Sequence, residues 1–206
     1  VDYLSIKYDP DGNELWARVR NSGAGQEWGR AIAVDDFGNV YVTGTWGYTG
    51  YESDEYGYPD YGTIKYDANG NELWVRTYDG PAHNYDEYAT LALDESGNVY
   101  VTGASEGEGT NYDYATVKYD PNGNELWVQR YDGGGGTWHE DLAHAIVVDS
   151  SGNVYVTGKS RMGSGAYDYA TIKYVQSGES QPFYFVHITD PHVWYDPILC
   201  PHGGQT

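Results

Sequence analysis

Histidine and carboxylate side chains gather in two segments that precede strand-like stretches of this chain. His83 stands in the first segment, and His139 and His144 flank Glu140 and Asp141 in the second. Imidazole and carboxylate groups are common metal ligands, but their spacing here does not select a tetrahedral site. The sequence also shows no Ser-His-Asp order, no Gly-x-Ser-x-Gly motif and no phosphate-binding glycine loop. We therefore predict that the chain is not an enzyme and has no catalytic residue.

Aromatic side chains alternate with carboxylates and glycines between residues 45 and 59. Their flat faces give a large contact area at little cost in conformational entropy, so the set suits a glycan, a basic partner or a subunit contact. The alternative is an insertion that packs on its own aromatic rings. The candidate binding residues are Trp46, Tyr48, Tyr51, Tyr56 and Tyr58, with Trp138 in another long loop.

The pattern Asp-x-x-Gly-Asn marks six short segments. It is typical of a type I turn followed by a left-handed glycine, with the Asp carboxylate accepting turn amides. The turn that begins at Asp9 also shares its first residues with a calcium loop, but the later Glu and the flanking helices are absent. We predict hairpin turns and no resident cofactor, with Ca²⁺ left open. The segments are residues 9–13, 35–39, 67–71, 94–98, 120–124 and 149–153.

A longer repeat organises these turns. The string Asp-Tyr-Gly/Ala-Thr-Ile/Val-Lys-Tyr begins at Asp60, Asp113 and Asp168, with a looser copy at Asp2. Such a repeat indicates one unit stacked on copies of itself, because a single unit cannot bury both of its apolar faces. Each unit contains four short segments rich in Val, Thr, Tyr and Trp, which predicts the four-stranded antiparallel blade of a β-propeller.

The strand count predicts an open array. From the innermost strand outwards, residues 2–20 supply only the two outer strands, 29–79 and 87–132 supply complete blades, and 141–174 supply three strands. We expect the innermost strand, with its apolar residues on both faces, to be the most buried. A closed ring needs about four or more blades, so both ends should expose apolar faces and unpaired edges. The short turns should share one rim, and the long variable loops, where binding is expected, the other.

The repeat over about residues 2–174 resembles the β-propeller repeat family named for seven-bladed propellers. The resemblance rests on the string from Asp113 to Trp127, followed by an apolar strand and by Gly-Asn-Val-Tyr-Val-Thr-Gly at 152–158. It implies a non-catalytic repeat found mostly in large secreted or envelope-associated bacterial and archaeal proteins. This chain has about three repeats, fewer than a closed ring.

The repeat stops after Tyr174. Residues 175–182 are predicted to be a linker, and 183–206 a C-terminal extension. The segment 183–193 is similar to the opening strand of calcineurin-like metallophosphoesterases. That resemblance implies that Asp190 and His192 would bind the first of two metal ions, but the later ligand motifs of that family are missing, so a dinuclear site would need a full phosphoesterase domain to follow.

The composition of the chain limits the classes of partner that it can bind. The net charge is −20, with 31 acidic against 11 basic side chains, which disfavours nucleic acid as a partner. No apolar run is long enough to cross a membrane. The single cysteine, Cys200, has no partner within the chain, and the chain starts at Val1 inside a repeat, which suggests that upstream sequence was removed or never included. An extracellular or cell-surface location is expected.

Together these observations predict an all-β, β-propeller-type array of about three four-stranded blades, incomplete as a ring, with a C-terminal extension. The expected function is structural: head-to-tail self-association, or association with further blades of a longer chain, extending to a filament if the rotation does not close. The expected assembly strand leaves its own subunit to complete the next. Two alternatives remain: the front part of a secreted metallophosphoesterase, or a glycan- or protein-binding module that uses the long-loop rim. The assembly strand contains Phe183, Phe185, Val186 and Ile188.

Overall fold

The computed structural model describes residues 2–21, 25–48, 58–134, 139–161, 167–175 and 185–188. These residues form strands joined by turns and loops, as their Val, Thr, Tyr and Trp content predicts. The strands are β1 (Tyr3–Tyr8), β2 (Glu14–Arg20), β3 (Gln26–Val34), β4 (Val40–Tyr48), β5 (Asp60–Tyr66), β6 (Glu72–Tyr78), β7 (Asp86–Leu93), β8 (Val99–Glu106), β9 (Tyr112–Tyr119), β10 (Glu125–Tyr131), β11 (Leu142–Val148), β12 (Val154–Arg161), β13 (Tyr167–Tyr174) and β14 (Phe185–Ile188).

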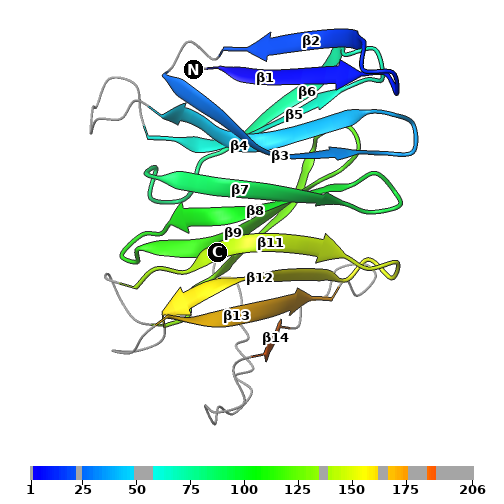
Figure 1. Ribbon diagram of the computed structural model, residues 1–206. Coiled ribbons are helices and arrows are strands. Elements are labelled where there is room, and N and C mark those ends of the chain that lie inside the picture. The colour runs from blue at the N-terminus through cyan, green and yellow to red at the C-terminus, as the bar shows by residue number, and fades with distance from the viewer. Residues whose placement is uncertain are drawn as a thin grey trace.

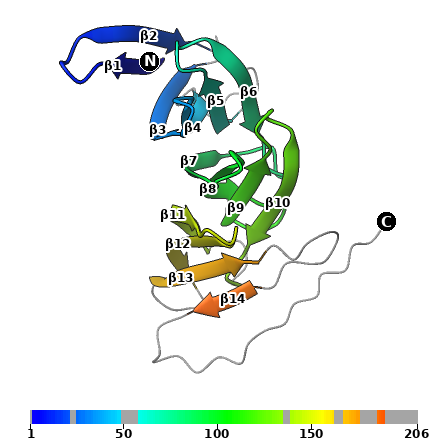
Figure 2. The same ribbon diagram turned by 90° about the vertical axis from the view of Figure 1, so that its right-hand side faces the viewer.

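The strands make four antiparallel sheets. β1 and β2 form a two-stranded sheet, which we call blade I, and three four-stranded sheets follow in the order β3–β6 (blade II), β7–β10 (blade III) and β11–β14 (blade IV). The blades are stacked one on another from the N-terminal to the C-terminal end (Figure 1). Figure 2 shows β3, β7 and β11 along one side of the stack and β6 and β10 along the other. The predicted all-β, incomplete propeller-type array is therefore confirmed.

The six Asp-x-x-Gly-Asn segments are hairpin turns, as predicted. In the turn of blade III, the Gly123 amide donates to the carbonyl of Asp120 at 2.9 Å, and Gly123 has a φ of 83°. The Asp120 carboxylate accepts the amides of Asn122 and Asn124 and the side-chain amide of Asn124, each at 2.8 Å. The equivalent carboxylate of Asp9 is used in the same way, so turn contacts satisfy it.

The middle strands are the most buried, and the innermost are not, contrary to the sequence-based expectation. All but the last residue of β8 are buried, whereas β11 leaves His144, Ala145 and Val147 exposed. A middle strand has neighbours on both edges and a blade against each face. An innermost strand has one free edge, because the array is open on that side.

The first two blade boundaries are fastened by the same contacts. The Trp74 indole and the Lys65 ammonium of blade II both donate to the carbonyl of Pro121, in the turn of blade III, at 3.1 and 3.0 Å. Trp16 and Lys7 of blade I make the same pair of bonds to Ala68 of blade II. An apolar cluster fills each of the three boundaries. Successive side chains of a strand point to opposite faces of its sheet, so Val, Ile and Tyr residues reach the blades on both sides.

The placement of β14 corrects the prediction for the assembly strand. Phe185 pairs with Tyr174 and Ile188 with Thr171, so β14 is the outer strand of blade IV in its own chain. This segment was expected to leave its subunit and complete the next one. Only a short stretch separates it in sequence from the open edge of β13, and a short loop makes pairing within the chain the less costly choice. Phe183 lies outside the described residues.

Candidate functional site

The two end faces of the array differ from every interior boundary. Tyr3, Tyr61 and Tyr114 occupy the same position in blades I to III, and each is at most 2% exposed. Each packs against the blade that follows it; the Tyr114 hydroxyl, for example, donates to the carbonyl of Ala170 at 3.3 Å. The fourth copy, Tyr169 in blade IV, is 55% exposed. In the described residues no blade follows blade IV, and Tyr169 therefore meets solvent.

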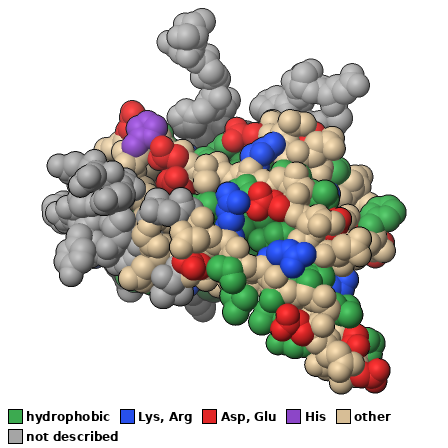
Figure 3. Space-filling model, turned by 90° about the horizontal axis from the view of Figure 1, so that it is seen from above, with side chains coloured by type: hydrophobic (Ala, Val, Ile, Leu, Met, Phe, Trp, Pro, Cys, Tyr) green, Lys and Arg blue, Asp and Glu red, His purple; other side chains and the backbone are tan. Residues whose placement is uncertain are grey.

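The opposite end shows the complementary difference. Tyr66, Tyr119 and Tyr174 are at most 3% exposed, whereas the equivalent Tyr8 in blade I is 55% exposed. The interior copies pack against the tryptophan of the preceding blade, with ring centroids about 6 Å apart. Leu4, on the same side of β1 as Tyr8, is exposed as well. Figure 3 views this end of the array and shows hydrophobic side chains among the charged ones.

Carboxylates converge at the boundary between blades II and III, on the long-loop rim. Asp60 begins β5, Asp79 follows β6 and Asp86 begins β7, and one oxygen of each lies within 4.8 Å of the others. Asp79 also contacts the exposed His83, with 2.6 Å between Oδ2 and Nδ1. Asp86 is fully buried; its Oδ2 accepts the Gly80 amide at 2.6 Å, and the Ser105 hydroxyl is a further hydrogen-bond partner of this carboxylate. We call these three residues the first carboxylate cluster.

Burial and mutual repulsion perturb this cluster. Burial, with the negative charges of Asp79 and Asp86, raises the pKa of Asp60 to about 7. Burial also raises the pKa of Asp86 to about 7, although Ser105 and the Gly80 amide partly offset it. Three carboxylates this close cannot all ionise at neutral pH without a nearby positive charge.

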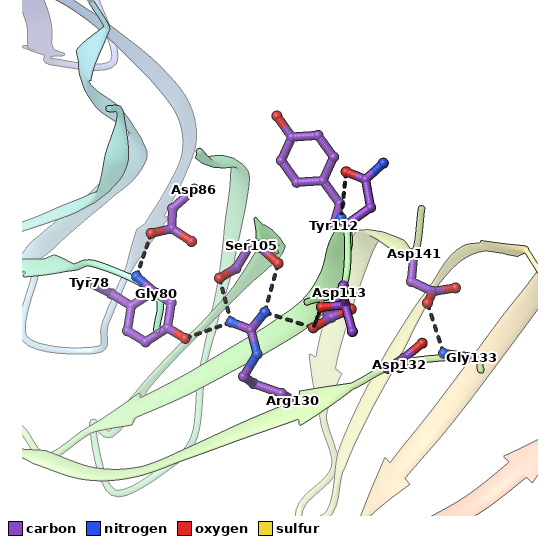
Figure 4. Close-up of polar contacts among 12 residues, drawn as sticks. Tyr78, Gly80, Asp86, Ser105, Tyr112, Asp113, Arg130, Asp132, Gly133 and Asp141 are labelled. Carbon is purple, nitrogen blue, oxygen red and sulfur yellow. Dashed lines mark hydrogen bonds and ion pairs between the residues drawn. The ribbon is translucent and has the colours of Figure 1, made fainter. Parts of the chain in front are cut away.

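The boundary between blades III and IV repeats the arrangement with one change. Asp113, Asp132 and Asp141, the second carboxylate cluster, also have oxygens within 4.8 Å of one another. Here Arg130 Nη2 lies 2.8 Å from Asp113 Oδ2, and its guanidinium also donates to the Tyr78 hydroxyl and to Ser105 (Figure 4). Burial raises the pKa of the Asp113 carboxyl, and Arg130 opposes that effect. The second cluster thus has a cation supplied by the chain.

The predicted aromatic site is only partly represented in the described residues. Trp46 is partly buried at the blade I–II boundary, where it packs against Tyr3, at 5.9 Å between ring centroids. Tyr58 lies on the long-loop rim against Tyr85, at 4.9 Å. Tyr48 ends β4. Tyr51, Tyr56, Trp138, Asp190 and His192 lie outside the described residues.

Sequence reasoning missed both carboxylate clusters. It treated Asp60 and Asp113 as the first letter of a strand repeat and considered the nearby histidines instead. His83 contacts the first cluster through Asp79, whereas His139 and His144 belong to neither cluster. A signal was present: an Asp follows the outer strand at both Asp79 and Asp132, and a further Asp begins the next blade. Blade stacking brings these positions together with the start of the third strand.

Comparison with known proteins agrees with this architecture. Residues 23–45 and 135–161 match a family model described as a beta-propeller repeat. Each match covers an innermost strand and most or all of the strand paired with it, β3 with β4 and β11 with β12. A search of curated proteins found no match. No helix in the described residues has the length and apolar character needed to cross a membrane. Over these two segments the chain is therefore similar to the beta-propeller repeat family.

Proposed function

We propose that this chain is a non-catalytic structural module, extracellular or at a cell surface, whose two end faces associate head-to-tail with further blades of the same kind. The partner is a second copy of the chain or further blades of a longer chain. Repeated association without closure would build a filament. The acidic composition and the resemblance to repeats of secreted proteins favour an exterior location.

One observation carries the proposal. Positions that are buried at every interior blade boundary are exposed at the two ends: Tyr169 at one, Tyr8 at the other. The interior boundaries supply the template for what would cover them. Tyr169 would donate to a backbone carbonyl as Tyr114 does, and Tyr8 would pack against a neighbouring blade as Tyr66 packs on Trp16. The two faces are complementary to each other and not to themselves, which favours head-to-tail over head-to-head association.

The experiment uses one disabling change for each face. Size-exclusion chromatography with light scattering should show larger species of the unmodified chain as its concentration rises. Tyr8→Asp and Tyr169→Asp should each remain monomeric alone, because each removes one of the two faces. An equimolar mixture of the two variants should form a 1:1 dimer, since each retains the face that the other lacks.

Leu73→Asp is the matched control. Leu73 is exposed on the outer strand of blade II, away from both end faces, so this variant should associate like the unmodified chain. A monomeric unmodified chain at all concentrations would refute self-association. Homodimers of either tyrosine variant would refute the head-to-tail arrangement.

A further inference from the structure

The Asp-x-x-Gly-Asn turn between β1 and β2 of blade I, residues 9–13, exposes a surface that the equivalent turns of blades II and III bury. Gly12 is exposed, whereas Gly70 and Gly123, which hold the same turn position, are buried. A Cβ at Gly12 would meet nothing within 4 Å. A Cβ at Gly70 or Gly123 would lie 2.7 or 2.9 Å from Cδ2 of a tryptophan in the preceding blade. At both of these interior boundaries a tryptophan therefore covers the turn.

Three side chains of the preceding blade bind each of the two buried turns. The Trp16 indole and the Lys7 ammonium both donate to the carbonyl of Ala68, at 3.2 and 3.0 Å. Arg18 Nε donates to the carbonyl of Gly70 at 2.6 Å. Each turn thus accepts one indole, one ammonium and one guanidinium. The same set at the next boundary consists of Trp74, Lys65 and Arg76, which donate to Pro121 and Gly123.

The turn of blade I offers acceptors for the same three donors. Pro10 and Gly12 supply the two carbonyls at the equivalent positions, and both residues are exposed. Glu14, also exposed, corresponds to Glu72, whose carboxylate lies 3.1 Å from the guanidinium of Arg20 in the preceding blade. The chemistry that fits this turn is therefore a basic edge that carries an indole.

Blade IV differs from this donor pattern. In blades I and II the outer strand places a tryptophan opposite the lysine of the third strand, and an arginine two residues later. In blade IV, Val186 is opposite Lys173, and Ile188 follows two residues later. Neither valine nor isoleucine can donate a hydrogen bond from its side chain. In the described residues, blade IV thus has the lysine of the set without its tryptophan and arginine.

We infer that the turn of blade I binds the outer strand of another repeat blade, one that carries Trp-x-Arg opposite a lysine. The indole and ammonium of that blade donate to the Pro10 carbonyl, its guanidinium donates to the Gly12 carbonyl, and its indole ring packs on Tyr8. This inference rests on the proposed head-to-tail association and specifies the chemistry of one partner. Blade IV of a second copy should bind here more weakly than a blade built like blade II.

The double variant Val186→Trp/Ile188→Arg, which gives blade IV the missing donors, tests this inference. Light scattering over a concentration series should give a dissociation constant for self-association roughly 30-fold below that of the unmodified chain, because each of two added hydrogen bonds contributes a factor of about five. The matched control, Val186→Phe/Ile188→Leu, adds a ring without a donor and should give a much smaller change. If the tryptophan variant does not fold, Ile188→Arg alone adds one donor and should tighten association about fivefold.

Gly12→Ala, added to the double variant, should remove the gain, because its Cβ would meet the incoming indole ring. Gly109→Ala is the control: Gly109 has a similar φ, 78° against 85°, and open space around it, and it lies between β8 and β9 in the interior of the array. It should keep the gain. Association of the double variant no tighter than that of the unmodified chain, or a gain that survives Gly12→Ala, would overturn the inference.

These outcomes are distinguishable from failure of the proposed self-association. An unmodified chain that stays monomeric while the double variant associates would refute self-association of the natural chain and support the preference for tryptophan and arginine. An unmodified chain that associates as tightly as the double variant would support self-association and refute the preference. If both chains stay monomeric, both proposals fail.

Discussion

Aspartate occurs repeatedly on both rims of the array, and the surroundings on the two rims shift its pKa in opposite directions. On the short-turn rim, the Asp120 carboxylate accepts the side-chain amide of Asn124 and two backbone amides, and these bonds hold its pKa below the usual range. On the long-loop rim, Asp86 is buried beside other carboxylates, and its pKa rises to about 7. One residue type therefore stabilises the turns and is under electrostatic strain at the blade boundaries.

Aspartates in the turns and aspartates at the blade boundaries obtain their partners in different ways. A turn aspartate obtains its partners from the next four residues, so the local sequence alone satisfies it. A boundary aspartate obtains its neighbours only when blades stack. Arg130 forms an ion pair with Asp113 of the second cluster, and its positive charge also acts on Asp86 of the first.

The largest expected effect comes from removing that arginine. Arg130→Thr places at the second cluster the residue found at the equivalent position of the first, and leaves Asp113 buried without its ion pair. We expect a loss of about 3 kcal/mol in the free energy of unfolding, because a buried carboxylate becomes unpaired. Urea denaturation measures the loss.

Arg76→Thr is the control for that change. In the described residues Arg76 donates to the backbone carbonyls of Gly123 and Val75 and pairs with no carboxylate, so its loss should cost about 1 kcal/mol. Equal losses in the two variants would mean that the ion pair with Asp113 contributes nothing beyond ordinary hydrogen bonds.

The next effect tests the short-turn rim. Gly123 and Gly152 hold the same turn position, with φ values of 83° and 79°. A Cβ at Gly123 would lie 2.9 Å from Cδ2 of Trp74, in the neighbouring blade, whereas a Cβ at Gly152 would meet nothing within 4 Å. Gly152→Ala should cost about 1 kcal/mol for the left-handed backbone. Gly123→Ala should cost roughly 2–4 kcal/mol, because Trp74 must also move.

Thermal or urea denaturation of the two alanine variants separates the turn from the blade contact. If both lose the same stability, the turn of one blade does not pack on the tryptophan of the preceding one. Gly134, in a long loop, also has a positive φ of 79° with open space around it, so it should behave like Gly152. Although Gly134 lies in a glycine-rich loop, its left-handed backbone should make a substitution there about as costly as one at Gly152.

The repeat made most of the fold predictable. Spacing of the Asp-Tyr-Gly/Ala-Thr strings and the Asp-x-x-Gly-Asn turns indicated the blades, the strand order and the open ends, because these depend on local pattern. The pairing of β14 was not predicted, since Phe185–Ile188 carries no repeat motif and its position depends on the free edge of β13. The carboxylate clusters depend on contacts between blades, which spacing within one repeat does not reveal. Trp46 was assigned to a binding surface because its loop is aromatic, yet it packs on Tyr3.

The smallest effect concerns pH and compares Asp120→Asn on the short-turn rim with Asp141→Asn at the second cluster. The hydrogen bonds from Asn124 and the turn amides lower the folded pKa of Asp120, so its stabilisation is present above the unfolded pKa of about 3.9 and is lost as the pH falls through the folded value. Burial raises the folded pKa of Asp141, so its ionised form opposes folding at neutral pH. That cost disappears as the pH falls through the raised pKa.

The two asparagine variants should therefore depart from the unmodified chain in opposite directions as the pH is lowered from 7 to 3. The stability advantage of the unmodified chain over Asp120→Asn should shrink, whereas its stability relative to Asp141→Asn should increase. Asparagine keeps a carbonyl oxygen for the Gly133 amide but loses the acceptor of the Arg161 amide. Because that loss does not change with pH, the pH trend of the second comparison reports the charge. Urea denaturation across this pH range measures both differences. If the two stability differences changed in the same direction with pH, the pKa values of Asp120 and Asp141 would not be shifted in opposite directions, because the sign of each pKa shift alone sets the direction of each trend.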